Sequence, residues 1–184
     1  MSPINRILQA EIEKRMQPGK VMLLFGARRV GKTMLIKSIA DRFQGRKMIL
    51  NGEDSSTHLL LQEKTITNYR LLLHDTDLLI IDEAQNIPDI GMKLKLIVDE
   101  IPTVYVIASG SSSFDLLNLA GEPLVGRSQT FYLFPFSQEE LLQVENRVEA
   151  IQNLPVKLIY GSYPQTICMT NIQKEEYLTD MVNA

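Results

Sequence analysis

The sequence predicts an α/β protein of three layers, in which helices cover both faces of a central parallel sheet. Short continuous apolar runs alternate with stretches of helical periodicity, as expected for strands that are buried on both sides. The segment GARRVGKT (26–33) joins the first apolar run to a helical stretch. The acidic pair Asp82-Glu83 directly follows a later run, LLII. These three observations together indicate a P-loop nucleotide-binding fold.

The predicted elements follow one another in this order along the chain. An amphipathic helix over 4–17 ends at Pro18-Gly19. Strands are predicted at 21–25, 47–50, 78–81, 103–108 and 129–134, and helices at 34–43, 56–74 and 90–100. Ser137 and Glu140 have the spacing of a capping box, and the pattern is helical from about residue 136 onward. We therefore expect a core over 1–135 and a short helical extension over 136–184.

The segment GARRVGKT matches the phosphate-loop pattern G-x-x-x-x-G-K-[ST]. Its glycines allow backbone N–H groups to curve around phosphate oxygens, and the next helix offers its N-terminus to the same anion. Lys32 would reach the β- and γ-phosphates, and the Thr33 hydroxyl would ligate Mg²⁺. The residues expected to contact nucleotide here are Gly26, Ala27, Arg28, Arg29, Val30, Gly31, Lys32, Thr33 and Met34. An ordinary glycine-rich turn is the alternative, and Arg28 and Arg29 fit a solvated loop face equally well.

The acidic pair in LLIIDEAQ (78–85) lies where a parallel strand reaches the carboxyl edge of its sheet. Asp82 would hold Mg²⁺ through its water shell, opposite Thr33. Glu83 is placed to activate a water for attack on the γ-phosphate, as a general base. An acidic pair at a helix N-terminus is the alternative. Gln85 either orients the water, holds Glu83 or faces the loop.

Two other classes of nucleotide protein fit the sequence less well. A guanine-nucleotide switch usually carries an N-K-x-D motif, which is absent from this sequence. A phosphotransferase rarely places a water-activating glutamate beside the magnesium aspartate, so we expect water as the acceptor.

Bulk properties limit the remaining possibilities. A net charge of −3 and a pI near 5.5 give no broad positive surface for nucleic acid. The single Cys168 excludes an internal disulfide and any multi-cysteine metal site, and it fits the cytoplasm. No apolar stretch has the length of a membrane span, so no membrane association is predicted.

Five sequence blocks together resemble the bacterial and archaeal AAA-type ATPase family, also called archaeal-type ATPases. The blocks are GARRVGKT, LLIIDEAQNI, VIASGSSSFDL (106–116), GEPLVGRSQTFYLFPFSQEEL (121–141) and YGSYPQ (160–165). The resemblance implies a central sheet of strand order 5-1-4-3-2 and adenine nucleotides, ATP and ADP, as ligands. It also implies that a C-terminal domain of unknown function follows, so that 136–184 is a partial lid or linker toward that domain. The N-terminal helix and the loop around Pro18-Gly19 are candidates to line the base.

The resemblance also assigns roles to individual residues. The phosphate loop and the acidic pair match the family's own, with Ala27 where the family often has proline. Ser109 and Ser111 stand where the wider superfamily keeps a polar residue that senses the γ-phosphate, although hydroxyls after a strand often cap a helix instead. The resemblance makes Ser109 a nucleotide-binding residue and Ser111 a catalytic one, beside Lys32 and Glu83.

Arg127 resembles the arginine finger that reaches a neighbouring subunit's γ-phosphate, which implies a homo-oligomer. A salt-bridged structural arginine, or an arginine that contacts nucleotide in its own chain, is the alternative. The family's second arginine, on the helical lid, has no counterpart in YGSYPQTI (160–167).

The sequence therefore predicts Mg²⁺-dependent binding and hydrolysis of ATP that drives or gates an attached domain or partner. The alternative is a regulatory switch that holds nucleotide with little turnover, because both classes retain the phosphate loop and the acidic pair. The missing lid arginine and a chain that ends inside a predicted helix, KEEYLTDMVNA (174–184), lead us to expect weak or absent hydrolysis by this chain alone.

Overall fold

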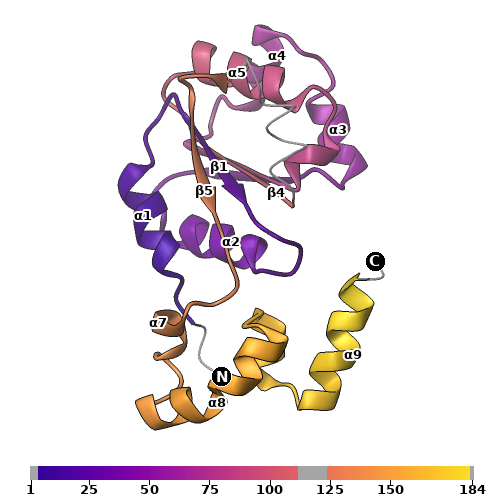
Figure 1. The fold of residues 1–184 in the computed structure, drawn as a ribbon. Coiled ribbons are helices and arrows are strands. Elements are labelled where there is room, and N and C mark those ends of the chain that lie inside the picture. The colour runs from indigo at the N-terminus through magenta and orange to yellow at the C-terminus, as the bar shows by residue number, and fades with distance from the viewer. Residues whose placement is uncertain (1–3, 112–123, 183–184) are drawn as a thin grey trace.

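In the computed structural model, which describes residues 4–111 and 124–182, helices lie on both faces of a five-stranded sheet (Figure 1). The first half of the chain forms α1 (Ile7–Arg15), β1 (Val21–Phe25), α2 (Lys32–Arg42), β2 (Lys47–Asn51), α3 (Ser55–Leu60) and α4 (Ile66–Leu72). It continues with β3 (Leu78–Asp82), η1 (Ala84–Asn86), α5 (Ile90–Glu100), β4 (Tyr105–Gly110) and β5 (Ser128–Tyr132). The chain then enters α7 (Gln138–Leu141), α8 (Arg147–Tyr160), η3 (Pro164–Cys168) and α9 (Asn171–Val182).

The sheet is parallel throughout, with strand order β2-β3-β4-β1-β5. Counted from the β5 edge this is 5-1-4-3-2, the order implied by the resemblance. In the strand register Leu24 lies opposite Ser109, and Ile81 lies opposite Ala108. The ends of β1, β4 and β3 therefore meet at one edge of the sheet, where the phosphate loop and the acidic pair begin.

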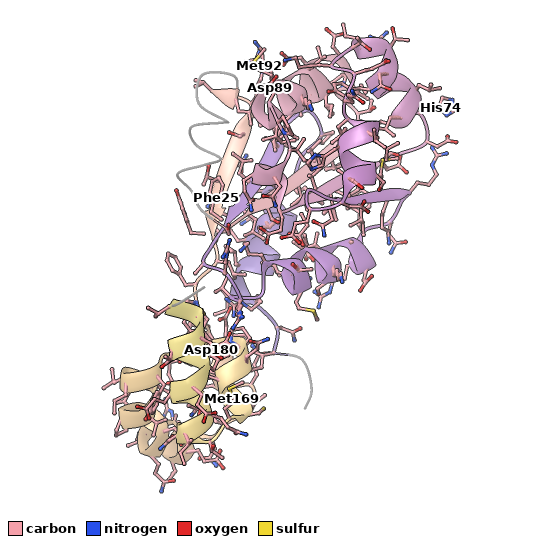
Figure 2. All side chains as sticks on the ribbon, turned by 90° about the vertical axis from the view of Figure 1, so that its right-hand side faces the viewer. Phe25, His74, Asp89, Met92, Met169 and Asp180 are labelled. Atoms are coloured by element: carbon pink, nitrogen blue, oxygen red, sulfur yellow. The ribbon has the colours of Figure 1, made fainter. Side chains whose placement is uncertain are left out.

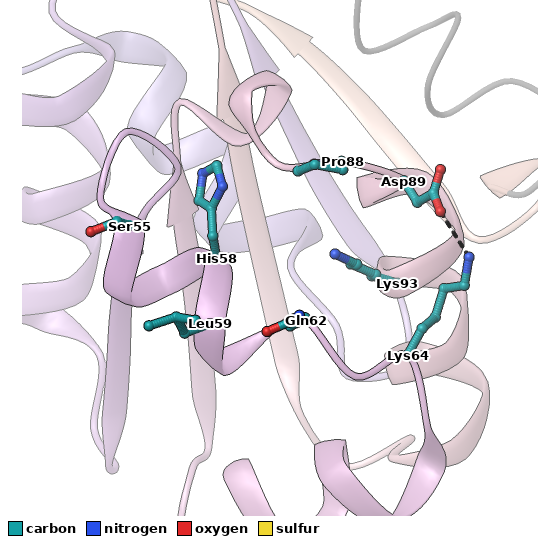
Figure 3. A pocket seen from close by; sticks show the side chains of 8 residues that line it. All are labelled: Ser55, His58, Leu59, Gln62, Lys64, Pro88, Asp89 and Lys93. Atoms are coloured by element: carbon teal, nitrogen blue, oxygen red, sulfur yellow. Dashed lines mark hydrogen bonds and ion pairs between the residues drawn. The ribbon is translucent and has the colours of Figure 1, made fainter.

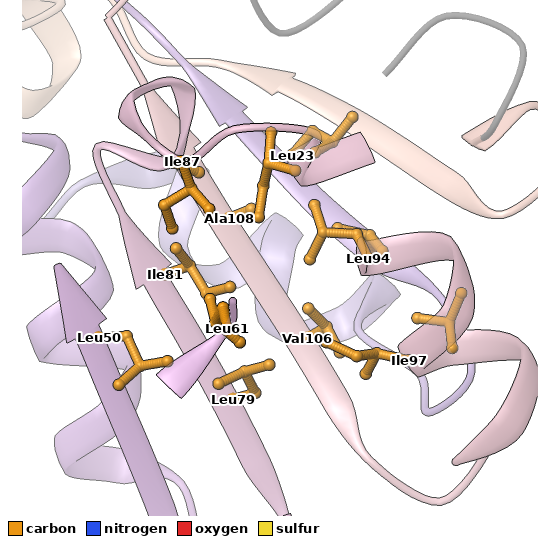
Figure 4. Packing of buried hydrophobic residues seen from close by; sticks show 14 of the residues in the cluster. Leu23, Leu50, Leu61, Leu79, Ile81, Ile87, Leu94, Ile97, Val106 and Ala108 are labelled. Carbon is orange, nitrogen blue, oxygen red and sulfur yellow. The ribbon is translucent and has the colours of Figure 1, made fainter. Parts of the chain in front are cut away.

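Alternate strand residues form two separate hydrophobic cores, because successive side chains of a strand point to opposite faces. Leu23, Ile81 and Val106 belong to the core beneath α3, α4 and α5 (Figure 4). Met22, Ile80 and Ile107 belong to the core beneath α1 and α2. The continuous apolar strands predicted from the sequence are thus covered on both faces, as in other parallel sheets.

The helices from α7 to α9 gather at one end of the molecule, away from α4 and α5 (Figures 1 and 2). The N-terminal segment, which leads into α1, contacts the first of these helices, α7. Arg6 and Glu140 form an ion pair at 3.4 Å with side chains 9% and 6% exposed, and Glu140 Oε1 accepts from the Ile7 N–H at 2.9 Å. Ser137 and Glu140 form the predicted capping box. No helix among residues 4–111 and 124–182 has the length and apolar character to span a membrane.

The structure differs from the predicted elements mainly between β2 and β3. The segment predicted to be helical around 56–74 is interrupted: it forms the two helices α3 and α4, each with its own cap. Asp54 accepts from the Ser56 N–H, and Thr65 accepts from the Asn68 N–H. Leu61, in the break between the helices, is fully buried, so packing of this side chain accompanies the interruption. The last two strands each begin or end about two residues from the predicted position.

Candidate nucleotide-binding site

The phosphate loop connects β1 to α2, and its two glycines are required for different reasons. A Cβ on Gly26 would lie 2.4 Å from the Leu133 carbonyl oxygen, so only glycine fits beside the exit of β5. Gly31 has φ +100°, a left-handed conformation at the N-cap of α2 that L side chains rarely adopt. Arg29 also has a positive φ, 63°. The loop therefore turns sharply enough to direct its backbone toward the N-terminus of α2.

Lys32 lies inside the concavity of this loop, with only 5% of the residue exposed. Its Nζ donates to the carbonyl oxygens of Gly26 at 2.9 Å and Ala27 at 3.2 Å. Burial lowers the pKa of the ammonium, and the nearby carboxylates of Glu83 and Asp82 oppose that shift. The loop thus holds a positive charge next to the acidic pair, as a phosphate site requires.

Thr33 and Asp82 meet across the end of the sheet. Thr33 Oγ1 donates to Asp82 Oδ2 at 2.7 Å, although the two residues are 49 positions apart in sequence. The other oxygen, Oδ1, accepts from the Glu83 N–H at 3.1 Å and from the hydroxyl of Ser109, which is fully buried. A hydroxyl and a carboxylate in contact are oxygen donors of the kind Mg²⁺ takes, with phosphates and water completing its shell. These two side chains therefore fit a magnesium ion bound together with a nucleotide.

Glu83 follows Asp82 with a left-handed backbone, φ 48°. Its Oε2 accepts from Gln85 Nε2 at 2.7 Å, and the same nitrogen lies 3.3 Å from Ser111 Oγ. Gln85 thus holds Glu83, one of the roles considered for this amide. The structure joins Glu83, Gln85 and Ser111 in one hydrogen-bonded chain that begins next to Asp82.

Gly52, which the sequence analysis missed, supports the acidic pair from the neighbouring strand. Its N–H donates to the Asp82 carbonyl oxygen at 2.8 Å, and a Cβ added here would lie 2.2 Å from the Glu83 carbonyl oxygen. His58 Nε2 donates to the Gly52 carbonyl oxygen at 2.6 Å. The sequence does contain a signal for this role, because Gly52 follows the predicted strand 47–50 and a glycine at a strand end often marks a close approach of two backbone segments.

The remaining loop residues take different positions. Arg29 lies with its guanidinium carbon 5.1 Å from the centroid of the Tyr177 ring in α9. Arg28 and Ala27 are exposed, and the Met34 side chain is 68% exposed. Val30 is fully buried among the residues that α1 and α2 cover, so its side chain faces the core rather than a ligand.

Arg127 is not brought to this site. It precedes β5, and its carbonyl oxygen accepts from the Val21 N–H at the start of β1, which places it at the amino edge of the sheet. The phosphate loop lies at the other end of β1, roughly 17 Å away for a strand of this length. Arg127 Nε binds Asp99 Oδ1 at 2.6 Å, and this contact raises the pKa of the guanidinium. The arginine is therefore salt-bridged in its own chain and far from its own phosphate loop.

A cavity of about 260 Å³ adjoins the phosphate loop between the N-terminal segment, α2 and the helical extension. Its lining residues are Ile4, Asn5, Arg6, Gln9, Val30, Gly31, Met34, Leu35, Ser38, Phe136 and Pro164. Arg6 Nη1 is buried there with no hydrogen-bond partner in the described parts of the chain. The N-terminal helix thus borders the loop, as expected for a base-binding element. Pro18-Gly19 does not, because the Gly19 N–H bonds the Val104 carbonyl oxygen at the amino edge.

Residues 112–123 of the resemblance blocks lie outside the described residues. Among the described residues, no group of three or more His, Cys, Asp or Glu side chains could hold a metal ion. The metal-binding candidates are therefore the Thr33 hydroxyl and the Asp82 carboxylate, with the nucleotide supplying further oxygens.

Comparison with known proteins identifies the family of the chain. A family model described as an AAA domain matches residues 18–142. An uncharacterized protein of Methanocaldococcus jannaschii is 24% identical over 94% of this chain and 43% of its own length. An uncharacterized protein of Mycobacterium tuberculosis is 32% identical over 67% of this chain and 27% of its own length. The chain thus spans less than half the length of these relatives.

Two solved structures share the fold. A signal transduction ATPase with numerous domains from Pyrococcus horikoshii, which carries a tetratricopeptide repeat sensor, superposes with a TM-score of 0.58 at 14% identity. The match covers 88% of this chain and 28% of that one. Domain III of the Thermotoga maritima replication initiation protein DnaA superposes with a TM-score of 0.54 at 16% identity, covering 96% of this chain and 90% of that domain.

Proposed function

Because the chain belongs to the AAA domain family, we propose that it binds ATP with Mg²⁺ and hydrolyses it, and that its nucleotide state controls an attached domain or partner. The observation that supports this best is the contact of Thr33 with Asp82 at 2.7 Å, directly beside Lys32 and Glu83. A hydroxyl, a carboxylate, an ammonium and a second carboxylate are the groups that phosphoryl transfer to water uses. We also place the protein in the cytoplasm, which a single cysteine in 184 residues fits.

Each residue then has a defined task. The N–H groups of the loop and of the first turn of α2 bind the phosphates, and Lys32 exchanges its two carbonyl partners for phosphate oxygens. Thr33 and Asp82 hold Mg²⁺, which neutralises charge that develops on the phosphates. Glu83 accepts a proton from the attacking water after its carboxylate leaves Gln85. Ser109 fixes the Asp82 carboxylate.

We place the base of the nucleotide in the cavity beside Gly31. The cavity has apolar walls from Leu35, Phe136 and Pro164, and polar groups from Arg6 and Gln9. Flat apolar walls with a few hydrogen-bonding groups suit a purine. Arg6 and Gln9 would supply the polar groups that form hydrogen bonds with the ring.

Phosphate release from ATP tests the proposal. Lys32→Ala should abolish ATP-dependent thermal stabilisation, whereas Glu83→Gln should retain binding and lose at least tenfold in single-turnover hydrolysis. The matched control is Glu11→Gln, an exposed carboxylate of α1 that pairs with Arg15 outside the site. Hydrolysis by Glu83→Gln at the rate of the parent chain would disprove the role of Glu83.

A regulatory switch is the second candidate, and two observations favour it. The Glu83 carboxylate is already engaged by Gln85, and Arg127 lies at the opposite edge of the sheet. Both arrangements slow turnover until a partner rearranges the site. A switch predicts that ATP and ADP bind tightly while multiple-turnover phosphate release stays near background. A self-sufficient ATPase predicts steady release under the same conditions.

A further inference from the structure

A second cavity, of about 590 Å³, lies between α3, the segment that follows it and the start of α5 (Figure 3). Its lining residues are Ser55, His58, Leu59, Gln62, Lys64, Pro88, Asp89 and Lys93. The phosphate loop and the magnesium ligands are not among them. The cavity is of the size that small-molecule sites usually have, roughly 300–1,000 Å³.

Lys93 is the unusual residue of this cavity. It is only 6% exposed, and its Nζ has no hydrogen-bond or ion-pair partner in the described parts of the chain. The nearest acidic group, Asp89, is bound at 2.9 Å by Lys64 instead. Figure 3 shows the Lys93 side chain extending toward the space between Pro88 and Gln62. Burial of the Lys93 residue removes part of the water around its ammonium group, which penalises the charge and lowers the pKa of Lys93, while the carboxylate of Asp89 opposes that shift.

The backbone adds to the positive potential at the same place. Lys93 lies in the first turn of α5, an eleven-residue helix whose N-terminus carries unpaired N–H groups and the positive end of the dipole. No acidic residue occupies that first turn, and the Asp89 side chain does not cap it. Asp89 itself has φ 54°, a left-handed conformation. Among the residues that line the cavity, two lysines, Lys93 and Lys64, thus accompany a single carboxylate, that of Asp89, and the positive end of the α5 dipole lies nearby.

We propose that this cavity binds a small organic anion, whose phosphate or carboxylate group contacts Lys93 close to the N-terminus of α5. Lysine ammoniums and helix N-termini both bind such groups. Leu59 and Pro88 provide an apolar wall for the body of the ligand, and Ser55 and Gln62 provide polar contacts. The bound anion compensates the charge of Lys93, whose ammonium has no hydrogen-bond or ion-pair partner in the described parts of the chain. The site does not depend on the proposed ATP hydrolysis.

Phosphate would also bind the loop at Lys32, so the test uses a Lys32→Ala background. In that variant, labelled with ¹⁵N, inorganic phosphate and succinate are titrated separately and amide shifts are followed. We expect saturable shifts at residues 55–62 and 89–93 with at least one of the two anions, and the stronger response identifies phosphate or carboxylate as the preferred group. Absence of saturable shifts there with both anions would overturn the proposal.

Two further variants separate ligand binding from general charge. Lys93→Met keeps the apolar stem of the side chain and should weaken the titrated anion at least tenfold. Lys95→Met, on the same helix but outside the cavity, should leave its affinity unchanged. Equal affinity in Lys93→Met and Lys95→Met would refute the role of Lys93.

Thermal unfolding without added anion distinguishes a ligand-binding lysine from a structural one. Lys93→Met removes a charge that burial has partly desolvated, so its melting temperature should equal or exceed that of the parent chain. A clear fall in melting temperature together with unchanged anion shifts would assign Lys93 to the core and reject the site.

Discussion

Replacement of Gly52 by alanine should impair catalysis through the backbone of the acidic pair. A Cβ at this position would lie 2.2 Å from the Glu83 carbonyl oxygen, whereas real Cβ contacts essentially never fall below 3.0 Å. The oxygen must therefore retreat by at least 0.8 Å, the difference between these two distances. The obstacle is backbone, and Glu83 is already held in a left-handed conformation, so the displacement moves the residue itself.

The size of the effect follows from this displacement. Overpacking of this kind destabilises a fold by about 1–3 kcal/mol. For a chain of this length, that corresponds to a fall in melting temperature of roughly 2–12 °C. A misplacement of about 1 Å reduces catalysis by up to roughly 100-fold. We therefore expect single-turnover hydrolysis to fall by about 10- to 100-fold, while ATP affinity changes by less than roughly threefold because Lys32 and Thr33 stay in place.

Gly19→Ala is the matched control for this variant. Gly19 has φ +75°, but its Cβ would meet nothing closer than the Pro102 carbonyl oxygen at 3.5 Å, at the opposite edge of the sheet. In Gly19→Ala the left-handed backbone conformation should lower the free energy of unfolding by about 1–2 kcal/mol. The variant should hydrolyse ATP at the rate of the parent chain. If Gly52→Ala hydrolysed ATP as fast as Gly19→Ala, the close approach of Gly52 to the Glu83 backbone would not be needed for hydrolysis, and the prediction would be refuted.

Three further predictions concern metal binding, the helical extension and pH. Asp82→Asn should reduce the Mg²⁺-dependent gain in ATP affinity by roughly tenfold or more, measured by calorimetry with and without the metal; an unchanged gain would exclude Asp82 as a ligand. Glu140→Gln breaks the buried pair with Arg6 and should lower the free energy of unfolding by about 3 kcal/mol, whereas the exposed Glu11→Gln should have no measurable effect on denaturant unfolding. Burial raises the pKa of Tyr69 from 10.0 to about 12, so the folded state retains a proton that the unfolded state loses between these values. The contribution of Tyr69 to the free energy of unfolding should therefore be fully present below pH 10 and fall by roughly 1.4 kcal/mol per pH unit between pH 10 and 12. If Tyr69→Phe showed the same slope, the pH dependence would belong to other groups.

Local patterns predicted most of the sheet and the chemistry at its carboxyl edge. The apolar runs at 21–25 and 78–81 form β1 and most of β3, because buried parallel strands consist of such runs. The phosphate-loop spacing predicted that Thr33 and Asp82 would lie opposite each other, and they are in contact. These features depend on short segments whose geometry the residues themselves determine.

The features that the sequence did not predict depend on contacts between distant segments. Packing of Leu61 and the cap at Thr65 divide a continuous helical pattern into two helices. Arg6 becomes a cavity residue only because Glu140, more than 130 positions away, fixes it there. Lys93 appears in sequence as one of two lysines on an amphipathic helix, and its burial depends on neighbouring segments that lie far from it in sequence. Residue type and spacing carry no signal for such pairings.

The position of Arg127 at the amino edge determines how any assembly in which it serves a neighbour's phosphates is built. The arginine and the phosphate loop lie at opposite ends of β1, so the amino edge of one sheet must face the carboxyl edge of the next. In a two-fold dimer a single patch would have to include both ends of β1, with the two copies of the strand antiparallel, so that each arginine meets the other loop. In a head-to-tail arrangement the two ends belong to separate patches, and repeated contacts generate a closed ring or an open filament according to the rotation between neighbours.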